Sequence, residues 1–464
     1  MSAALALLRT EPRARVFFAV LAQSSLGTGA AYVALLVVAY DRFRSPWAIS
    51  LVLLADFLPS MFLGPLLGAA VDRWSRRLCA VSADVLRAGA FVGIAVVGSF
   101  ELTVLFALVA GLGTALFRPA ALASIPSLVE RERTAAATSL YGAITDFGYT
   151  GGPAIAAAAL ALVGPDALLI GNGVTFAVSA LVIANIPFGL SVPREDAAGR
   201  RSLFREARHG LGASFHMHGV RVVIVAFAVG TFFGGVFNVV ELPFATDVLG
   251  TSASGYSVLI TVYGIGFIVG SLGGSSGGEA PRLKRRYLQG LLLTGLGTLA
   301  VGGSYHFAVA VAAFGVGGFG NGLAVVHQRL LFQATVESSL QGRVFAVADA
   351  LMAWGFALGF LAAGAVSEAT GPREVLFIIG AGEVALAAAA TLALRGGWRT
   401  SRLAAPATSS GTAAARSSGV LRHAQVREES PHLVDGADFW LTLLDDLGQR
   451  RDDPGVELRP GIGD

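Results

Sequence analysis

Acidic and basic side chains occur inside long apolar stretches of this chain. Asp84 and Arg87 lie three residues apart, so one face of a helix would bring them together as an ion pair. Arg118 lies in a later apolar stretch and could join that pair or neutralise Asp72. A charge in hydrocarbon costs about 3 kcal/mol or more. Each of these groups therefore needs a partner or water, and each is a candidate functional group.

Asp146, near the middle of another apolar stretch, is the residue we expect to exchange a proton or bind a cation. Removal from water favours a neutral carboxyl, and such a group can take up and release protons near neutral pH. A hydrogen bond between packed helices is the alternative role for Asp146. Asp84, Arg87 and Arg118 could take part in proton coupling, or Asp84 and Arg87 could form a purely structural pair. Weaker candidates are Asp56, Glu241, Asp349 and Glu383.

A short cationic turn with one acid, Asp72, follows the second apolar stretch. Its carboxylate could accept hydrogen bonds from an arginine or from N–H groups at a helix start, a contact that one conformational state makes and another breaks. Gly64 and Gly68, four residues apart, would let a neighbouring helix approach closely. Alternatively, the arginines only hold the loop in the cytoplasm. The basic residues of the turn are Arg73, Arg76 and Arg77.

The amino-acid composition is that of an integral membrane protein. Hydrophobic residues make up 54% of the 464 positions and charged residues 14%, and the mean hydropathy is +0.67. A soluble protein carries about a quarter charged residues. The net charge of +3 is small and its arginines lie in loops, so it determines topology and does not indicate nucleic-acid binding. The sequence therefore predicts a polytopic protein of the lipid bilayer.

Enzymatic chemistry has no support in the sequence. The single cysteine, Cys79, excludes an intramolecular disulfide and a cysteine-based metal cluster. His and Cys spacing offers no metal site, and neither a Walker sequence nor a nucleophile elbow occurs. We expect no catalytic residues, cofactor or metal, and no ATP-driven transport by this chain alone.

About twelve apolar stretches are long enough to span the hydrocarbon. Arginines concentrate in alternate connections, which places both termini in the cytoplasm by the positive-inside rule. The protein is therefore expected in the cytoplasmic (inner) membrane. The expected spans lie near 16–40, 48–70, 78–98, 102–127, 135–163, 167–190, 220–245, 254–277, 287–304, 307–333, 343–368 and 373–395.

The polar segment 191–219 divides these spans six and six, and part of it has the spacing of a surface helix. A shift of 206 positions places Arg15 on Arg221 and Asp41 on Asp247, and a shift of 207 places Gly111 on Gly318. Such parallel repeats predict two pseudo-symmetric six-helix bundles, 1–190 and 220–395, around a central cavity. Residues 396–464 are expected to form a largely disordered cytoplasmic tail, in which 439–447 could form a short helix that contacts a protein.

The six-plus-six plan and the motif Gly68-Ala-Ala-Val-Asp72-Arg73-Trp-Ser-Arg76-Arg77 resemble the major facilitator superfamily over residues 10 to 395. The resemblance implies that Asp72 locks the outward-facing state by binding near Gly342 and Arg343. The equivalent turn of the second half lacks the acid, because Gly278 stands in its place, so one such lock is expected.

A second motif, Gly148-Tyr-Thr-Gly151-Gly152-Pro153-Ala-Ile-Ala156-Ala157, looks like the antiporter motif of the family's exporters, with Ala156 and Ala157 in place of its last two glycines. Together with 341–345 it is similar to a branch that contains macrolide exporters and the enterobactin exporter. An arginine that many drug–proton antiporters carry in helix four is replaced here by Ala107, so its coupling role cannot be carried over.

The resulting hypothesis is a monomeric, proton-linked exporter of small amphipathic molecules that works by alternating access. A dedicated siderophore or metabolite exporter is one alternative, and a non-transporting receptor or scaffold that uses the acidic tail is another. Substrate contacts in the cavity are expected from Tyr32, Tyr141, Asn238 and Trp354, although such aromatic residues also serve as packing groups.

Overall fold

The computed structural model describes residues 3–71, 74–186, 217–273 and 279–395. Every regular element in these residues is helical and no strand occurs among them, as the apolar stretches predicted. Ten helices in this part of the chain are long and apolar enough to cross a membrane. Asp72 and Arg73, the linker up to residue 216 and the tail from residue 396 lie outside the described residues.

The helices of the first half lie within a few residues of the expected spans. The longest helix changes direction at Gly164, where the backbone takes φ 77° and ψ 171° immediately before Pro165. It therefore consists of two helices, and the break falls between the expected spans 135–163 and 167–190. The helices are α1 (Ala3–Thr10), α2 (Pro12–Phe43), α3 (Pro46–Val71), α4 (Arg76–Val96), α5 (Phe100–Ser124) and α6 (Thr134–Asn185).

The helices of the second half follow the same pattern. One of them, α10, begins seven residues before the expected apolar stretch, because its first turns carry Arg282 to Arg286 and a helix can continue where lipid would exclude its charges. A π turn, Phe244–Val248, extends the first helix of this half. The helices are α8 (His218–Pro243), α9 (Ala253–Leu272), α10 (Ala280–Gly303), α11 (Phe307–Thr335), α12 (Ser338–Thr370) and α13 (Pro372–Ala393).

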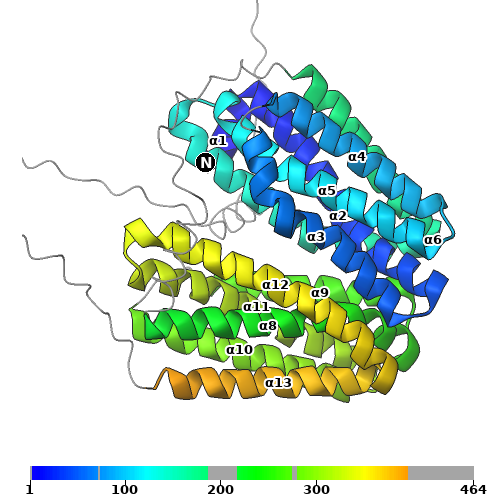
Figure 1. Ribbon diagram of the computed structural model, residues 1–464, viewed down its shortest axis with the longest axis vertical. Coiled ribbons are helices and arrows are strands. Elements are labelled where there is room, and N and C mark those ends of the chain that lie inside the picture. The colour runs from blue at the N-terminus through cyan, green and yellow to red at the C-terminus, as the bar shows by residue number, and fades with distance from the viewer. Residues whose placement is uncertain (1–2, 72–73, 187–216, 274–278, 396–464) are drawn as a thin grey trace, which may run out of the picture.

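The helices pack mainly within two groups, α1 to α6 and α8 to α13 (Figure 1). In the first group α2 lies along α6, and α5 lies against α3 and α4; in the second, α11 lies against α9 and α10, and α8 against α12 and α13. The groups meet through α6 with α9 and α3 with α12. Figure 1 shows that they diverge toward the side where the chain begins and α13 ends. We call that side the terminal face and the other side the opposite face.

Two close helix contacts show the same construction in both groups. A Cβ atom at Gly111 of α5 would lie 2.1 Å from the carbonyl oxygen of Asp56 in α3. A Cβ atom at Gly318 of α11 would lie 2.0 Å from the carbonyl oxygen of Tyr263 in α9. Both residues of the second contact lie 207 positions after those of the first. Only glycine permits backbones to approach this closely.

Candidate functional site

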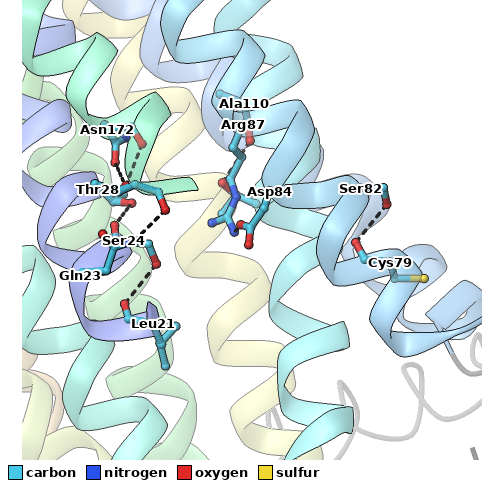
Figure 2. A network of polar contacts seen from close by, with 12 residues as sticks. Leu21, Gln23, Ser24, Thr28, Cys79, Ser82, Asp84, Arg87, Ala110 and Asn172 are labelled. Carbon is cyan, nitrogen blue, oxygen red and sulfur yellow. Dashed lines mark hydrogen bonds and ion pairs between the residues drawn. The ribbon is translucent and has the colours of Figure 1, made fainter. Parts of the chain in front are cut away.

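Asp84 and Arg87 form a buried ion pair on α4, as their three-residue spacing predicts. Nη2 of Arg87 donates to Oδ1 of Asp84, and Figure 2 shows the two side chains turned toward each other. The guanidinium lies over two aromatic rings, 4.2 Å from the centroid of Phe117 and 4.1 Å from that of Phe176. Oδ2 of Asp84 and Nε of Arg87 have no hydrogen-bond partner among the described residues. The pair is thus enclosed by α4, α5 and α6 within one helix group.

Polar contacts beside this pair join α2 to the second part of α6 (Figure 2). Nε2 of Gln23 donates to the carbonyl oxygen of Thr175 at 2.7 Å. The hydroxyl of Thr175 donates in turn to the carbonyl oxygen of Asn172 at 2.8 Å. Gln23 is half-buried, and its hydrogen bond to a backbone carbonyl of α6 links α2 to α6 at this point.

Asp146 lies on α6, but its side chain is exposed and not enclosed by helices as expected. The reason is the helical period: Gly148 and Gly152 turn a nearly opposite face of α6 toward α2. The charges that act on Asp146 are those of Arg329 in α11 and Arg118 in α5. The charge of Arg118 therefore acts on Asp146, and Arg118 does not take part in the Asp84–Arg87 ion pair.

The exporter-like motif lies where α2 and α6 come closest. A Cβ atom at Gly148 would lie 2.5 Å from Cβ of Ser25, and one at Gly152 would lie 2.5 Å from the backbone of Gly29 and Ala30. Pro153 is buried directly after them, inside α6. The small residues of the motif thus permit helix contact within the first group.

The cationic turn is described only in part, because Asp72 and Arg73 lie outside the described residues. Arg76 and Arg77 are half-buried at the start of α4. We expected a helix packed on Gly64 and Gly68, and this is wrong for the described conformation: no described neighbour lies within 4 Å of a Cβ atom at either position. Both glycines lie in the C-terminal part of α3, the end of that helix that points toward the terminal face (Figure 1).

The four expected substrate-cavity residues do not gather in one place. Tyr32 is half-buried on α2 and lies in the field of Glu241. Tyr141 belongs to the hydrophobic core of the first group and is 8% exposed, apart from the pocket of the second group. Asn238 lines a pocket within the second group. Trp354 is 48% exposed, and its ring contacts that of Phe62 across the two groups at 5.3 Å between centroids.

Two side-chain contacts join the helix groups near the opposite face, and neither was predicted from the sequence. The hydroxyl of Tyr40 donates to Oδ2 of Asp247. Nε1 of Trp47 donates to Oε2 of Glu368 at 2.9 Å. The repeat had matched Asp247 to Asp41, but nothing in the sequence indicated its contact with Tyr40. No group of three or more His, Cys, Asp or Glu able to hold a metal occurs among the described residues.

The chain is similar in sequence to a family of transporters and to two efflux proteins. The family model described as Major Facilitator Superfamily matches residues 16–289. Macrolide efflux protein A of Streptococcus pyogenes is 25% identical over 358 residues, which cover 73% of this chain and 85% of the relative. The multidrug efflux pump Tap of Mycobacterium bovis (strain BCG) is 26% identical over 373 residues, which cover 78% and 88%.

Two solved structures share the fold. A bacterial homologue of the human lysosomal transporter Spinster, in an inward-facing and unoccupied conformation, aligns with a TM-score of 0.65 at 18% identity, covering 83% of this chain and 98% of that one. The nucleoside transporter NupG aligns with a TM-score of 0.67 at 15% identity, covering 82% and 99%.

Proposed function

Because the chain belongs to the major facilitator superfamily and is a membrane transporter and not an enzyme, we propose that it exports small amphipathic molecules in exchange for protons. Transport would proceed by alternating access, in which two rigid helix groups rock about a central site. The efflux proteins among its relatives support the direction of transport.

The proposed architecture is two pseudo-symmetric bundles of six helices, 1–190 and 220–395, joined by 191–219. The break at Gly164 divides α6 into two helices, and α10 is 24 residues long although its first turns are charged. Counting both with the other candidate spans supports twelve transmembrane helices. The contacts Gly111–Asp56 and Gly318–Tyr263, spaced equally in the two halves, support the pseudo-symmetry. A single chain supplies both bundles, which is consistent with a monomer.

The relationship that carries the proposal is the placement of the contacts between the groups. Tyr40–Asp247 and Trp47–Glu368 join the groups near the opposite face, whereas the helices diverge toward the terminal face (Figure 1). If both termini lie on the cytoplasmic side of the inner membrane, this is the arrangement of an inward-facing transporter. The family's conformational lock, Asp72 with Gly68, Arg73, Arg76 and Arg77, would form when the terminal face closes.

Asp146 remains our proposed proton-coupling residue. An exposed carboxylate between the helix groups can meet water, and Arg118 and Arg329 supply opposite charge from either group. Protonation of Asp146 would weaken its attraction to Arg329 of the second group. Proton binding would thereby bias the two groups toward one arrangement. Asp84 and Arg87, which are enclosed within one group, are better suited to a structural role.

Proton-driven dye uptake into inverted membrane vesicles tests this proposal. Acidification of the vesicle lumen should drive a fluorescent amphipathic dye inward in exchange for protons, and an uncoupler should abolish the movement. Asp146→Asn should lose the gradient-driven component at normal expression. Glu101→Gln, which removes an exposed acid from the first turn of α5, is the matched control and should transport normally.

The two alternatives predict different results, the first in this experiment and the second in a comparison of variants. A folded wild-type protein that moves no dye would indicate a dedicated exporter of a siderophore or other metabolite. The receptor or scaffold alternative requires that loss of residues 400–464 abolish function while Asp72→Ala and Asp146→Asn leave it intact. The efflux relatives do not favour it.

A further inference from the structure

A pocket of about 210 Å³ lies inside the second helix group, apart from the contacts described above. Residues from α8 to α13 line it. Asn238, one of the expected substrate residues, is among them. The lining also includes Glu383 of α13, an acid deep inside an apolar helix.

Glu383 has no cationic partner in this pocket. Its side chain is 7% exposed, and Oε2 has no hydrogen-bond partner among the described residues. It is the only charged side chain among the described residues that line the pocket. A buried carboxylate with one unsatisfied oxygen and no cation beside it is costly, so a ligand that compensates its charge would bind favourably.

Among the other polar groups of the lining, the amides of Asn238 and Asn321 and the hydroxyl of Tyr263 offer both donors and acceptors, whereas the threonine hydroxyls bond mainly within their own helices. The hydroxyls of Thr231, Thr294 and Thr298 donate to carbonyl oxygens of their own helices, at 2.8, 2.9 and 3.1 Å. Nδ2 of Asn321 donates to the hydroxyl oxygen of Tyr263 at 2.8 Å. A threonine hydroxyl has a single proton, which Thr231 and Thr294 use within their own helices, whereas the hydroxyl of Thr298 also interacts with the Glu383 carboxyl. The charge of Glu383, with one oxygen left without a partner, therefore makes the pocket complementary to a cation and unfavourable for an anion.

Aromatic rings decide between a metal ion and an organic cation. Phe227, Phe237, Tyr263 and Phe356 line the pocket, and the rings of Phe237 and Tyr263 stack at 6.2 Å between centroids. Ring faces attract ammonium groups, and quaternary ammonium ligands are recognised in this way. A metal ion would instead require several oxygen ligands from charged or carbonyl groups. A single carboxylate among aromatic rings matches an organic ammonium group.

The volume and position of the pocket indicate how much of a ligand it holds. Sites for whole drug-sized molecules measure about 300–1,000 Å³, so this pocket would hold one end of such a molecule. Phe356 forms part of its wall and also contacts Phe57 of α3, 6.1 Å away between centroids. The pocket thus borders the interface between the helix groups, where the remainder of an amphipathic ligand would lie.

We propose that this pocket binds the ammonium group of amphipathic organic cations, with Glu383 as its counter-charge and the aromatic rings as its walls. This deepens the export function proposed above and rests on it for transport. Binding itself requires no gradient and no movement of the helix groups, so it can be measured separately.

Equilibrium dialysis of radiolabelled benzyltrimethylammonium against the purified full chain in lipid nanodiscs tests the proposal. Wild type should bind it saturably, and benzenesulfonate, of similar size and opposite charge, should not compete. Glu383→Gln keeps the shape of the side chain and should weaken binding about 30-fold or more, as expected for loss of a buried charge partner. Glu374→Gln removes an exposed acid from the first turn of the same helix and should bind like wild type. Phe237→Leu should weaken binding by removing one ring.

Absence of saturable binding to wild type, or equal binding to wild type and Glu383→Gln, would overturn the proposal. Dye export by a wild-type protein that binds no benzyltrimethylammonium would refute the cation pocket and leave the exporter intact. Saturable binding that depends on Glu383, without dye export, would support the pocket and refute the proposed export of amphipathic molecules such as the dye.

Discussion

The hydroxyl of Tyr40 donates a hydrogen bond to Oδ2 of Asp247, which ties the end of α2 to the π turn that follows α8. The other oxygen of Asp247 accepts from Thr246 at 2.9 Å, so the carboxylate is held in place from its own turn. These two residues belong to different helix groups. Their contact therefore exists only while the opposite face is closed.

Tyr40→Phe should shift the protein toward states open at the opposite face. A hydrogen bond to a charged group contributes about 1.5–3 kcal/mol, which corresponds to a population change of about tenfold or more. Spin labels at positions 99 and 251, in a Cys79→Ser background, would report the shift as a longer distance between the groups.

Tyr256→Phe is the matched control for this measurement. The Tyr256 hydroxyl donates to Oε1 of Glu241 at 2.7 Å, a contact within the second group. Its loss should leave the label distance unchanged. An unchanged distance in Tyr40→Phe as well would show that this contact does not hold the face closed.

Gly152→Ala should destabilise the protein, because the added methyl group would lie 2.5 Å from the backbone of α2. Forcing packed helices apart costs about 1–3 kcal/mol. Gly142→Ala, on the same helix with nothing within 4 Å of its Cβ, should be neutral or slightly stabilising. Unfolding of the purified variants in detergent measures both. Equal stability of the two variants would remove the close α2–α6 contact as a determinant of the fold.

Arg87→Met should destabilise the protein because it leaves Asp84 buried without its partner. Removal of one member of a buried pair costs about 3–5 kcal/mol, whereas replacement of both members by uncharged groups is often tolerated. The double variant Asp84→Asn/Arg87→Met should therefore recover much of the stability and retain gradient-driven dye uptake. A stable double variant that lost only the gradient dependence would instead assign the pair to proton coupling.

The positions of the helices could be predicted from hydropathy, since lipid selects apolar stretches of a given length. Hydropathy misses the part of a helix that carries charges, such as the first turns of α10 at Arg282 to Arg286. It also cannot show which face of a helix is covered. Asp146 was expected to be enclosed, but the glycine face of α6 packs on α2 and leaves Asp146 exposed.

Local spacing predicted local contacts and missed distant ones. The three-residue spacing of Asp84 and Arg87 predicted their pairing, because it is fixed by the helix itself. Tyr40 and Asp247 are brought together by the packing of two helix groups, which no short pattern specifies. Glu383 appeared in the sequence as one weak candidate among several, since only the structure shows that one oxygen of its buried carboxyl has no hydrogen-bond partner among the described residues.

Arginines clamp equivalent helix ends in the two groups. The guanidinium of Arg42 donates to the carbonyl oxygens of Ile94, Ala95 and Val97 at 2.6 to 2.8 Å. Arg373 donates to the carbonyl oxygens of Gly302 and Ser304 at 2.9 Å each. The final carbonyl groups of α4 and α10 have no partner within their own helices. One planar group with several donors satisfies them together.

Arg42→Lys and Arg373→Lys should each destabilise the protein by about 1–3 kcal/mol, although both keep the charge. The ammonium group of lysine cannot reproduce the fork that reaches several carbonyl oxygens at once. Arg44→Lys is the matched control, because Arg44 is exposed and only faces Asp41 at 3.7 Å, a contact expected to contribute little. Unfolding in detergent should rank Arg44→Lys with wild type and the other two variants below it. If all three unfolded alike, charge alone would suffice at these helix ends, and the geometry of the guanidinium would be irrelevant there.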